Sequence, residues 1–281
     1  MAARNKRNRH RRRRGRFGFL YKLLSVLVIF AAILTGCVVF FRVNQVEVTG
    51  NSRYTAQEII EASGVELGGN LFLINKPQAV RNIMRRLPYV EKVAVVKDLP
   101  DTLELHITES TAAAVVEAEG SCWLLNPSTK FVEQGDGELG NGLPKVTGIT
   151  PATPTLGARM AAAAEEQVRL EGLKGLFAAL SDQGMIENVT DFIDLTAANV
   201  IYFGYGEDLT VAVPMTGDFD KRIFSLRRVI ETFQERGEAV TGTLDLTYGD
   251  ERARLLPARW LPEGSVEKGE SGNGTEPPTE K

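Results

Sequence analysis

The sequence predicts an α+β fold for a single-pass membrane protein with two domains beyond the membrane. A basic N-terminal segment precedes one long apolar run, and strand and helix periodicities then follow in two successive groups. We expect a basic cytoplasmic head at 1–22, a transmembrane helix at 23–41, a first domain at 43–111, a second domain at 112–260 and a disordered tail at 261–281.

The N-terminal segment predicts a membrane span and its orientation. Ten of the 33 Lys and Arg residues lie in positions 1–22, which contain no Asp or Glu. The nineteen residues from Leu23 to Phe41 are uncharged, and a helix of this length can cross a hydrocarbon core. Because Lys and Arg are enriched on the cytoplasmic side, we expect the N-terminus inside and the chain after Arg42 outside.

The charge balance narrows the class of partner. Outside the head, 23 basic residues face 36 acidic residues, although the whole chain has a net charge of only −3. A basic cluster beside a span favours anionic lipid over nucleic acid. We therefore expect anionic lipid at the head, no nucleic acid and no small-molecule substrate.

Three interpretations compete for residues 19–41: a retained signal anchor, a cleaved signal peptide and a lipoprotein. A cleaved peptide needs a short apolar region and a small-residue cleavage site, whereas this run continues through Phe41 without an A-x-A pattern. Leu34-Thr35-Gly36-Cys37 resembles a lipobox, but apolar residues follow Cys37 where a polar tether is usual. The retained anchor is favoured, and a Cys37→Ser variant would test it.

Local signals predict the first domain as strand, helix, helix, strand, strand. A strand is expected at Val43–Val48, and a Thr55–Glu58 capping box begins a short helix that stops at Gly64. A second helix starts near Asn75, carries an apolar stripe and stops at Pro88. The stripe comprises Val80, Ile83, Met84 and Leu87.

Two more strands close the first domain, at Val90–Val96 and Thr102–Thr108. The second of them alternates apolar with polar residues, which places Leu103, Leu105 and Ile107 inward.

These residues resemble the POTRA domain of the FtsQ/DivIB cell-division family. The matching motifs are V-x-V-x-G-N at Val46–Asn51, G-x-N-L-F at Gly68–Phe72, L-P-x-V-x-x-V-x-V at Leu87–Val95 and P-x-T-L-x-L-x-I-x-E at Pro100–Glu109. They occur in order directly after a single span. The resemblance implies an extracytoplasmic POTRA domain (β-α-α-β-β) followed by the mixed-sheet β domain of that family.

The second domain is predicted as a mixed sheet with two helices. A hairpin is expected at 122–132 around Pro127-Ser128-Thr129, and helices at Ala158–Leu180 and Phe219–Arg236. Core candidates in the first helix are Val168, Leu173, Leu176 and Phe177, although Gly172 and Gly175 could interrupt it. Strands are expected near 191–196, 199–204 and 208–213, with a Tyr205-Gly206 turn, and at Gly242–Tyr248 and Arg252–Leu256.

No residue pattern points to catalysis, a cofactor or a metal. The histidines are His10, in the head, and His106, on the polar side of a strand, where a solvated or cross-strand role is the default. Cys122 could pair only with His106, and no metal-ligand spacing, nucleophile elbow or P-loop occurs. The abundant carboxylates leave a glycosidase pair open, but none has a recognisable context.

The family resemblance implies a non-enzymatic, membrane-anchored scaffold of the bacterial divisome at the septum, with FtsB/DivIC-type and FtsL-type partners. A late strand edge could accept a strand from a partner, and Tyr248 could serve as an anchor. The expected partner-binding residues are Asp245, Leu246, Thr247, Tyr248, Arg252, Arg254 and Leu256.

Two alternatives remain: an extracytoplasmic enzyme of the cell envelope and a POTRA-bearing translocation component. Turnover of peptidoglycan would favour the first. Translocation proteins usually carry repeated POTRA units or a barrel, whereas we expect one POTRA unit, no internal repeat and no barrel strands.

Overall fold

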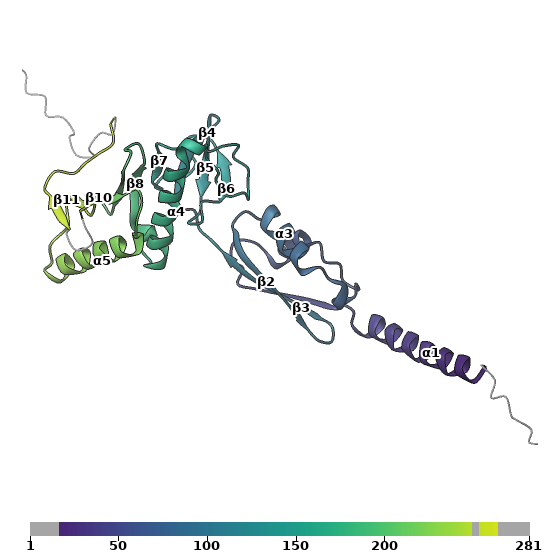
Figure 1. The fold of residues 1–281 in the computed structure, drawn as a ribbon. Helices are drawn as coiled ribbons and strands as arrows, with labels where there is room; N and C mark the ends of the chain where they lie inside the picture. The colour runs from purple at the N-terminus through teal and green to yellow at the C-terminus, as the bar shows by residue number, and fades with distance from the viewer. Residues whose placement is uncertain (1–16, 249–252, 264–281) are drawn as a thin grey trace, which may run out of the picture. The chain divides into compact units, whose positions relative to one another are not determined.

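The computed structural model describes residues 17–248 and 253–263, and these form two compact units (Figure 1). The first unit contains the chain up to Ile83 together with Val93–Ile107. The second contains Met84–Lys92 together with the chain from Thr108 onward.

A single long helix, α1 (Phe17–Phe40), precedes the folded part of the first unit. Gly18–Phe40 is apolar and long enough to cross a membrane. The helix begins before Leu23, the expected start, because Phe19, Leu20 and Tyr21 extend the apolar run and Lys22 is a single charge. Its Ser and Thr hydroxyls are satisfied internally, since Ser25 and Thr35 each donate to the carbonyl four residues earlier at 2.8 Å.

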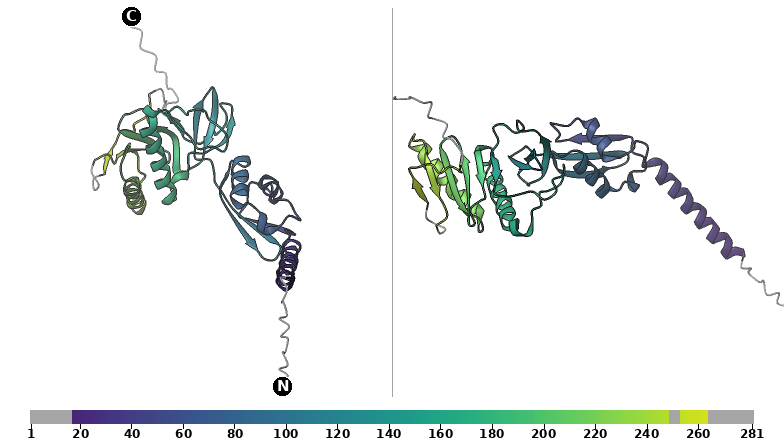
Figure 2. Two further views of the ribbon diagram at one scale, coloured as in Figure 1. Left: turned by 45° about the vertical axis from the view of Figure 1, so that its right-hand side comes forward. Right: turned by 90° about the horizontal axis from the view of Figure 1, so that it is seen from above.

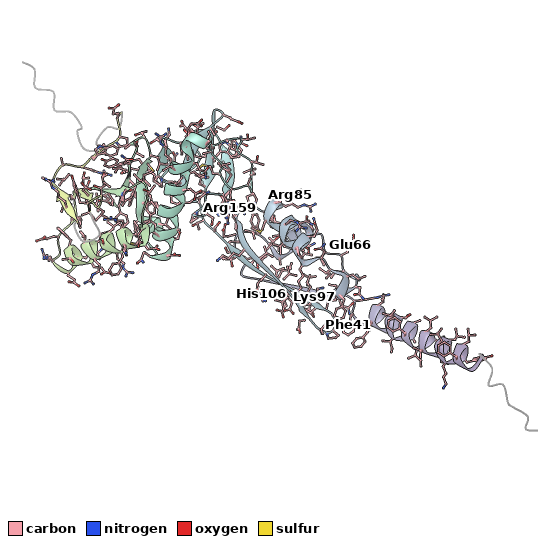
Figure 3. The ribbon with its side chains drawn as sticks, viewed as in Figure 1. Phe41, Glu66, Arg85, Lys97, His106 and Arg159 are labelled. Carbon is pink, nitrogen blue, oxygen red and sulfur yellow. The ribbon has the colours of Figure 1, made fainter. Side chains whose placement is uncertain are left out.

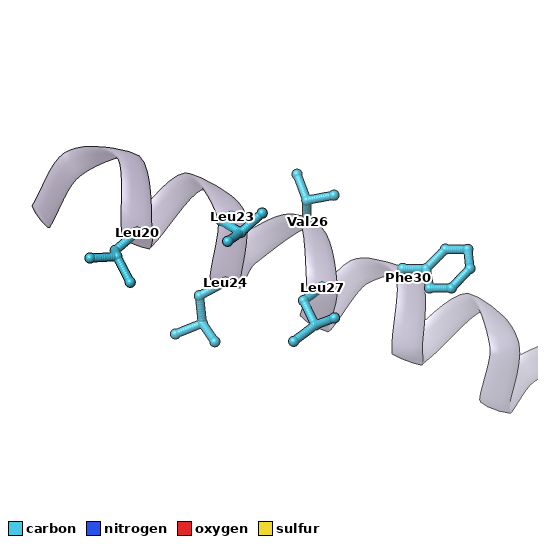
Figure 4. Close-up of a pocket in the computed structure, with 6 residues that line it drawn as sticks. All are labelled: Leu20, Leu23, Leu24, Val26, Leu27 and Phe30. Atoms are coloured by element: carbon cyan, nitrogen blue, oxygen red, sulfur yellow. The ribbon is translucent and has the colours of Figure 1, made fainter. Parts of the chain in front are cut away.

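The apolar side chains of α1 are exposed along its length, as Figure 4 shows for its first half. The hollow in Figure 4 is lined by this one helix alone, by Leu20, Leu23, Leu24, Val26, Leu27 and Phe30. A surface of this kind suits lipid acyl chains.

The first folded region is built on a three-stranded sheet of order β1-β3-β2. β1 runs parallel to β3 and pairs Val46 with Leu103 and Val48 with Leu105. The elements are β1 (Gln45–Thr49), α2 (Ala56–Ser63), the 3-10 turn η1 (Leu71–Leu73), α3 (Lys76–Arg86), β2 (Val90–Asp98) and β3 (Thr102–Glu109).

The local signals of this region are confirmed. Thr55 caps α2, with its hydroxyl accepting from the Glu58 amide and the Glu58 carboxylate accepting from the Thr55 amide, and Gly64 ends the helix in the left-handed conformation. Leu103, Leu105 and Ile107 are buried as expected.

The second unit is built on a mixed sheet of order β12-β11-β10-β9-β8-β7-β4-β5-β6. The strands are β4 (Ala114–Ala118), β5 (Ser121–Leu125), β6 (Phe131–Gly135), β7 (Lys145–Thr147), β8 (Val189–Asp194), β9 (Val200–Tyr205), β10 (Leu209–Pro214), β11 (Gly242–Asp245) and β12 (Arg254–Leu256). The helices are α4 (Gln167–Asp182), α5 (Phe219–Glu235) and the 3-10 turns η2 (Ala164–Glu166) and η3 (Ile186–Asn188).

Both long helices, α4 and α5, pack on the same face of this sheet (Figure 2). One continuous core joins them to inward side chains of the central strands, among them Ile193, Phe203, Val211 and Leu244. Because side chains alternate along a strand, the neighbours Phe192, Tyr202, Thr210 and Thr243 lie on the opposite face.

Two expectations for the first long helix of this unit are wrong: its start at Ala158 and the core position of Val168. Residues 158–163 are not helical, because their backbone pairs with other segments. The Phe131 amide donates to the Ala158 carbonyl, and the backbones of Arg159 and Lys130 form a β-bridge. Val168 is 53% exposed rather than part of the core. The glycines do not interrupt α4, and Gly172 allows close packing, since a Cβ there would lie 2.7 Å from the Met215 carbonyl oxygen.

The sheet contains an internal repeat that the sequence analysis missed. β7-α4-β8-β9 and β10-α5-β11-β12 share one topology, with two parallel strands joined through a helix and a third strand returning antiparallel. The registers also agree: Asp194 pairs with Thr147 and Tyr202, and Asp245 pairs with Ala212 and Arg254. The only sequence sign of the repeat is Asp-Leu-Thr, at 194–196 and at 245–247.

Candidate functional site

The expected partner-binding residues lie where β11 ends and the last strand forms. β11 ends at Asp245 rather than at Tyr248 as expected, because the chain turns there. The Asp245 carboxylate accepts from the Thr247 amide at 2.9 Å and from its hydroxyl at 2.6 Å, which closes a tight Asx turn. Leu246 is buried, and its amide donates to the Ala212 carbonyl at 2.9 Å, so this residue is a core anchor.

Tyr248 follows this turn, and its side chain is 58% exposed. Its carbonyl accepts from the Arg222 guanidinium on α5 at 3.4 Å. The backbone at Tyr248 is therefore tied to the helix while the ring remains available for contact.

β12 forms the end of the sheet and pairs antiparallel with β11 only. Of the expected residues, Arg254 and Leu256 lie on this strand, which begins later than expected, and Arg252 lies outside the described residues. The sequence analysis missed Leu255, which pairs with Leu244 and is 37% exposed. Gly242 allows the C-terminal end of β12 to lie close to the start of β11, since a Cβ at this position would overlap the Leu256 carbonyl oxygen.

The two edges of the nine-stranded sheet differ. At the β6 edge, residues 157–160 add backbone hydrogen bonds: the Phe131 amide donates to Ala158 at 3.0 Å, and the Gly157 amide donates to Phe131 at 2.8 Å. At the β12 edge, no strand of the described residues pairs with the outer side. An open edge of this kind can accept another strand.

The chain after β12 returns across the sheet face opposite the helices, and we call residues 257–262 the strap. Thr243 on β11 donates to the Ala258 carbonyl at 2.8 Å and accepts from the Trp260 amide at 2.8 Å. Thr210 on β10 donates to the Trp260 carbonyl at 2.7 Å. The strap thereby holds the end of β12 against the two strands beside it.

Aromatic and ionic contacts extend the strap to β9 and β8. The Trp260 ring stacks on Tyr202 with centroids 3.9 Å apart, and Arg259 pairs with Asp191 at 2.8 Å. Desolvation, followed by the charges of Asp245 and Asp194, raises the pKa of Tyr202. The sequence analysis did not anticipate the strap; Trp260 between Pro257 and Pro262 was its only local sign.

The residues weighed for catalysis have structural surroundings. His106 makes a cross-strand contact with the Thr49 hydroxyl at 2.8 Å and a contact with Glu104 at 3.1 Å, as the default interpretation expected. Cys122 is buried on β5. Among residues 17–248 and 253–263, no group of His, Cys, Asp and Glu side chains could hold a metal ion.

The charged side chain of Lys130 is buried within the second unit. Its ammonium donates to the Val90 carbonyl at 2.7 Å, and desolvation lowers its pKa. Beside it, the Asn126 amide donates to Glu91 at 2.7 Å and accepts from the Ser128 and Lys130 amides, which fixes the turn. These groups satisfy one another, as a structural polar network requires.

Comparison with known proteins agrees with this architecture. A sequence model described as the FtsQ-type POTRA domain matches residues 41–110. The cell division protein DivIB of Clostridium botulinum is 22% identical over 231 residues, covering 81% of this chain and 88% of that protein.

Two FtsQ proteins extend the comparison. The cell division protein FtsQ of Anaeromyxobacter is 24% identical over 200 residues, covering 70% of this chain and 65% of that protein. The cell division protein FtsQ of Corynebacterium glutamicum is 32% identical over 154 residues, covering 49% of this chain and 68% of that protein. With a single apolar helix, a POTRA domain and a mixed sheet in this order, the chain belongs to the FtsQ/DivIB family of cell division proteins.

Proposed function

We propose that this chain is a non-enzymatic scaffold that holds FtsB/DivIC-type and FtsL-type membrane proteins by strand addition at β12. The observation that carries the proposal is the outer edge of β12, with which no strand among residues 17–248 and 253–263 pairs. The opposite edge of the same sheet is covered in part by the chain's own residues 157 and 158, which bond to Phe131 at the start of β6.

Two exposed side chains support recognition beside this edge. Strand addition takes its affinity from backbone hydrogen bonds and its specificity from neighbouring side chains. Tyr248 offers an aromatic ring with a polar tip just after β11, and Leu255 offers an apolar surface on β12.

The strap, which directly follows β12, stabilises this strand from the sheet face opposite the helices. A three-residue strand has little stability of its own, and the strap hydrogen bonds to Thr210 and Thr243 hold its C-terminal end in place. A preformed edge lowers the ordering cost of binding.

Proline substitutions test the edge directly. In a β-strand successive amides point to opposite edges, so Arg254→Pro and Leu255→Pro differ: one removes an outward donor and the other a donor to β11. The measurement is capture of a purified DivIC-like partner from the same organism by the full-length chain in detergent.

We expect the proline that removes the outward donor to lower capture at least about tenfold, since a lost hydrogen bond and a blocked ladder cost more than about 1.4 kcal/mol. Fluorescence of Trp123 and Trp260 reports whether the second unit stays folded. Capture that is unchanged by both prolines contradicts strand addition at β12.

The scaffold role also requires the orientation expected from the basic head, with the N-terminus in the cytoplasm and the second unit outside. A C-terminal alkaline phosphatase fusion should then be active, whereas an N-terminal fusion should not. A fluorescent N-terminal fusion should gather at the division septum. An inactive C-terminal fusion would contradict the orientation.

A further inference from the structure

The junction between α1 and the first folded region is a closed, hydrogen-bonded structure rather than a flexible tether. Residues 67–73 form a loop beside the C-terminal end of α1. The Leu71 amide donates to the Phe41 carbonyl at 2.8 Å, the Val43 amide to the Gly69 carbonyl at 2.8 Å, and the Gly68 amide to the Val43 carbonyl at 2.8 Å.

The same loop reaches the last turn of the helix. The Asn70 amide nitrogen lies 3.4 Å from the Val38 carbonyl oxygen, one of the carbonyls that a helix end leaves without an intrahelical partner. The Phe41 and Phe72 rings meet edge to face with centroids 4.8 Å apart. The position of the loop along α1 is therefore fixed.

This loop carries large apolar side chains that the protein does not bury. Leu71 packs inside, whereas Leu67, Phe72 and Leu73 are 65%, 54% and 80% exposed. We call these three residues the collar. A cluster of this kind on a domain surface usually marks an interaction site.

Cationic groups flank the collar. Lys97 on β2 donates to the Phe72 and Ile74 carbonyls at 3.2 and 3.3 Å, and the backbone of Arg42, which follows Phe41, forms a β-bridge with Asn70. Figure 3 shows Phe41 at the end of α1 and Lys97 near it. Apolar side chains edged by Lys and Arg are typical of the boundary between acyl chains and lipid headgroups.

The length of the span places the collar at that boundary. The 23 residues of Gly18–Phe40 rise about 35 Å as a helix, whereas the hydrocarbon core is about 30 Å thick. The last turn of α1, to which the loop is fastened, therefore lies in the interfacial layer.

We propose that Leu67, Phe72 and Leu73 enter the interfacial layer of the leaflet from which the first domain emerges, so that this domain docks onto phospholipid. Continuity with the span favours lipid over a protein partner, because the collar is fastened to a helix end that lipid already surrounds. The docked collar holds the POTRA domain against the membrane surface.

Spin labelling of the full-length chain tests this docking. A nitroxide is attached at Leu73→Cys in a Cys37→Ser, Cys122→Ala background, and the protein is reconstituted into phosphatidylcholine–phosphatidylglycerol vesicles. The matched control is Gln57→Cys, exposed in the first turn of α2, after β1 has led the chain away from α1. Power saturation compares collisions with oxygen, which enters lipid, and with a water-soluble nickel complex.

We expect the Leu73 label to collide at least about threefold more with oxygen, relative to the nickel complex, than the Gln57 label does. Equal ratios at the two sites would overturn the proposal, as would a Leu73 signal that depends on the protein-to-lipid ratio, because a second copy of the chain would then cover the collar. The vesicles contain lipid and this chain but no partner protein. If the Leu73 label becomes inaccessible to the nickel complex only after a partner protein is added, the proposal is also overturned.

Discussion

The two halves of the internal repeat in the second unit have the same topology but different surroundings. In β7-α4-β8-β9, the returning strand β9 is covered by β10, which pairs with it from Tyr205 to Val200. In β10-α5-β11-β12, the returning strand β12 has no strand on its outer side among the described residues. The same unit of structure is therefore closed in one copy and open in the other.

This difference indicates what an added strand would look like. Within the chain, the strand that covers the returning strand of the first copy is antiparallel to it and sets Val211 opposite Phe203. Leu255 occupies the position in the second copy that Phe203 occupies in the first, because each is paired with the equivalent core residue, Leu244 or Ile193. A bound partner strand would be expected to set an apolar residue opposite Leu255.

The equivalent positions Phe203 and Leu255 provide the largest test of the comparison. Phe203 is fully buried, so Phe203→Ala should lower the free energy of unfolding by about 3–5 kcal/mol. Leu255→Ala should lower it by less than about 1 kcal/mol, while reducing partner capture several-fold. Both tryptophans, Trp123 and Trp260, belong to the second unit, so their fluorescence during urea denaturation reports that unit.

Similar losses of stability in the two alanine variants would mean that Leu255 is a core residue. In that case the second copy of the repeat would not be open at this position.

Sequence reasoning succeeded where the deciding contacts are local. The Thr55–Glu58 capping box, the Gly64 stop and the inward alternation of Leu103 and Leu105 depend on residues within a few positions of one another. It failed at residues 158–163, whose alanine-rich composition favours helix, because backbone pairing with β6 decides their conformation.

The candidate site was found only in part for the same reason. Family resemblance led to Asp245–Tyr248 and the following strand, but the open edge depends on the order of nine strands, which no local pattern encodes. The strap joins Trp260 to Thr210 and Tyr202, which lie far away in sequence. Periodicity carries no information about such contacts.

The two Asp-Leu-Thr turns give a second, smaller test of the repeat. Asp194 is buried and accepts from the Thr147 hydroxyl at 3.0 Å as well as from the Thr196 amide at 2.9 Å and hydroxyl at 2.5 Å. Within the described part of the chain, the Asp245 carboxylate accepts the two Thr247 bonds alone, and the residue is partly exposed. We expect Asp194→Ala to cost about 2–3 kcal/mol and Asp245→Ala about 1 kcal/mol, measured by the same denaturation. A larger cost for Asp245→Ala than for Asp194→Ala would contradict the conclusion that Asp194 is the more tightly bonded of the two.

The strap distinguishes the copies further, because its backbone hydrogen bonds go to Thr210 and Thr243 of the open copy, whereas it meets the closed copy through side chains on β8 and β9. Trp260→Ala should remove about 1–2 kcal/mol of local stability by losing the stack on Tyr202 and the contact with Phe192. The β12 amides should then exchange hydrogen faster, while β9 amides, held between two strands, change less. Trp260→Phe keeps an aromatic ring, so the exchange rate of its β12 amides should lie between those of the parent protein and of Trp260→Ala. Equal acceleration in β9 and β12 would mean that the strap stabilises the sheet as a whole.

The smallest expected effect is the ionisation of Tyr202, which lies between the two turns. Burial under the strap raises its pKa above the ordinary value of about 10, and the charges of Asp245 and then Asp194 raise it further. Since the pKa is higher in the folded protein than in the unfolded chain, the resulting stabilisation is present below pH 10 and is lost as the pH rises through the folded-state pKa. Absorbance of tyrosinate near 295 nm, as the difference between the parent protein and Tyr202→Phe, isolates this group from Tyr205, whose pKa burial also raises.

Asp245→Asn and Trp260→Ala should each move the titration of Tyr202 back toward its ordinary value, the first by removing a charge and the second by admitting water. If the strap is seated on Tyr202 in solution, the tryptophan variant should give the larger movement, because desolvation is the leading cause of the shift. A Tyr202 that titrates at its ordinary pKa in the parent protein would place the strap off the sheet. β12 would then lose the support that distinguishes a preformed edge from a loose end of the chain.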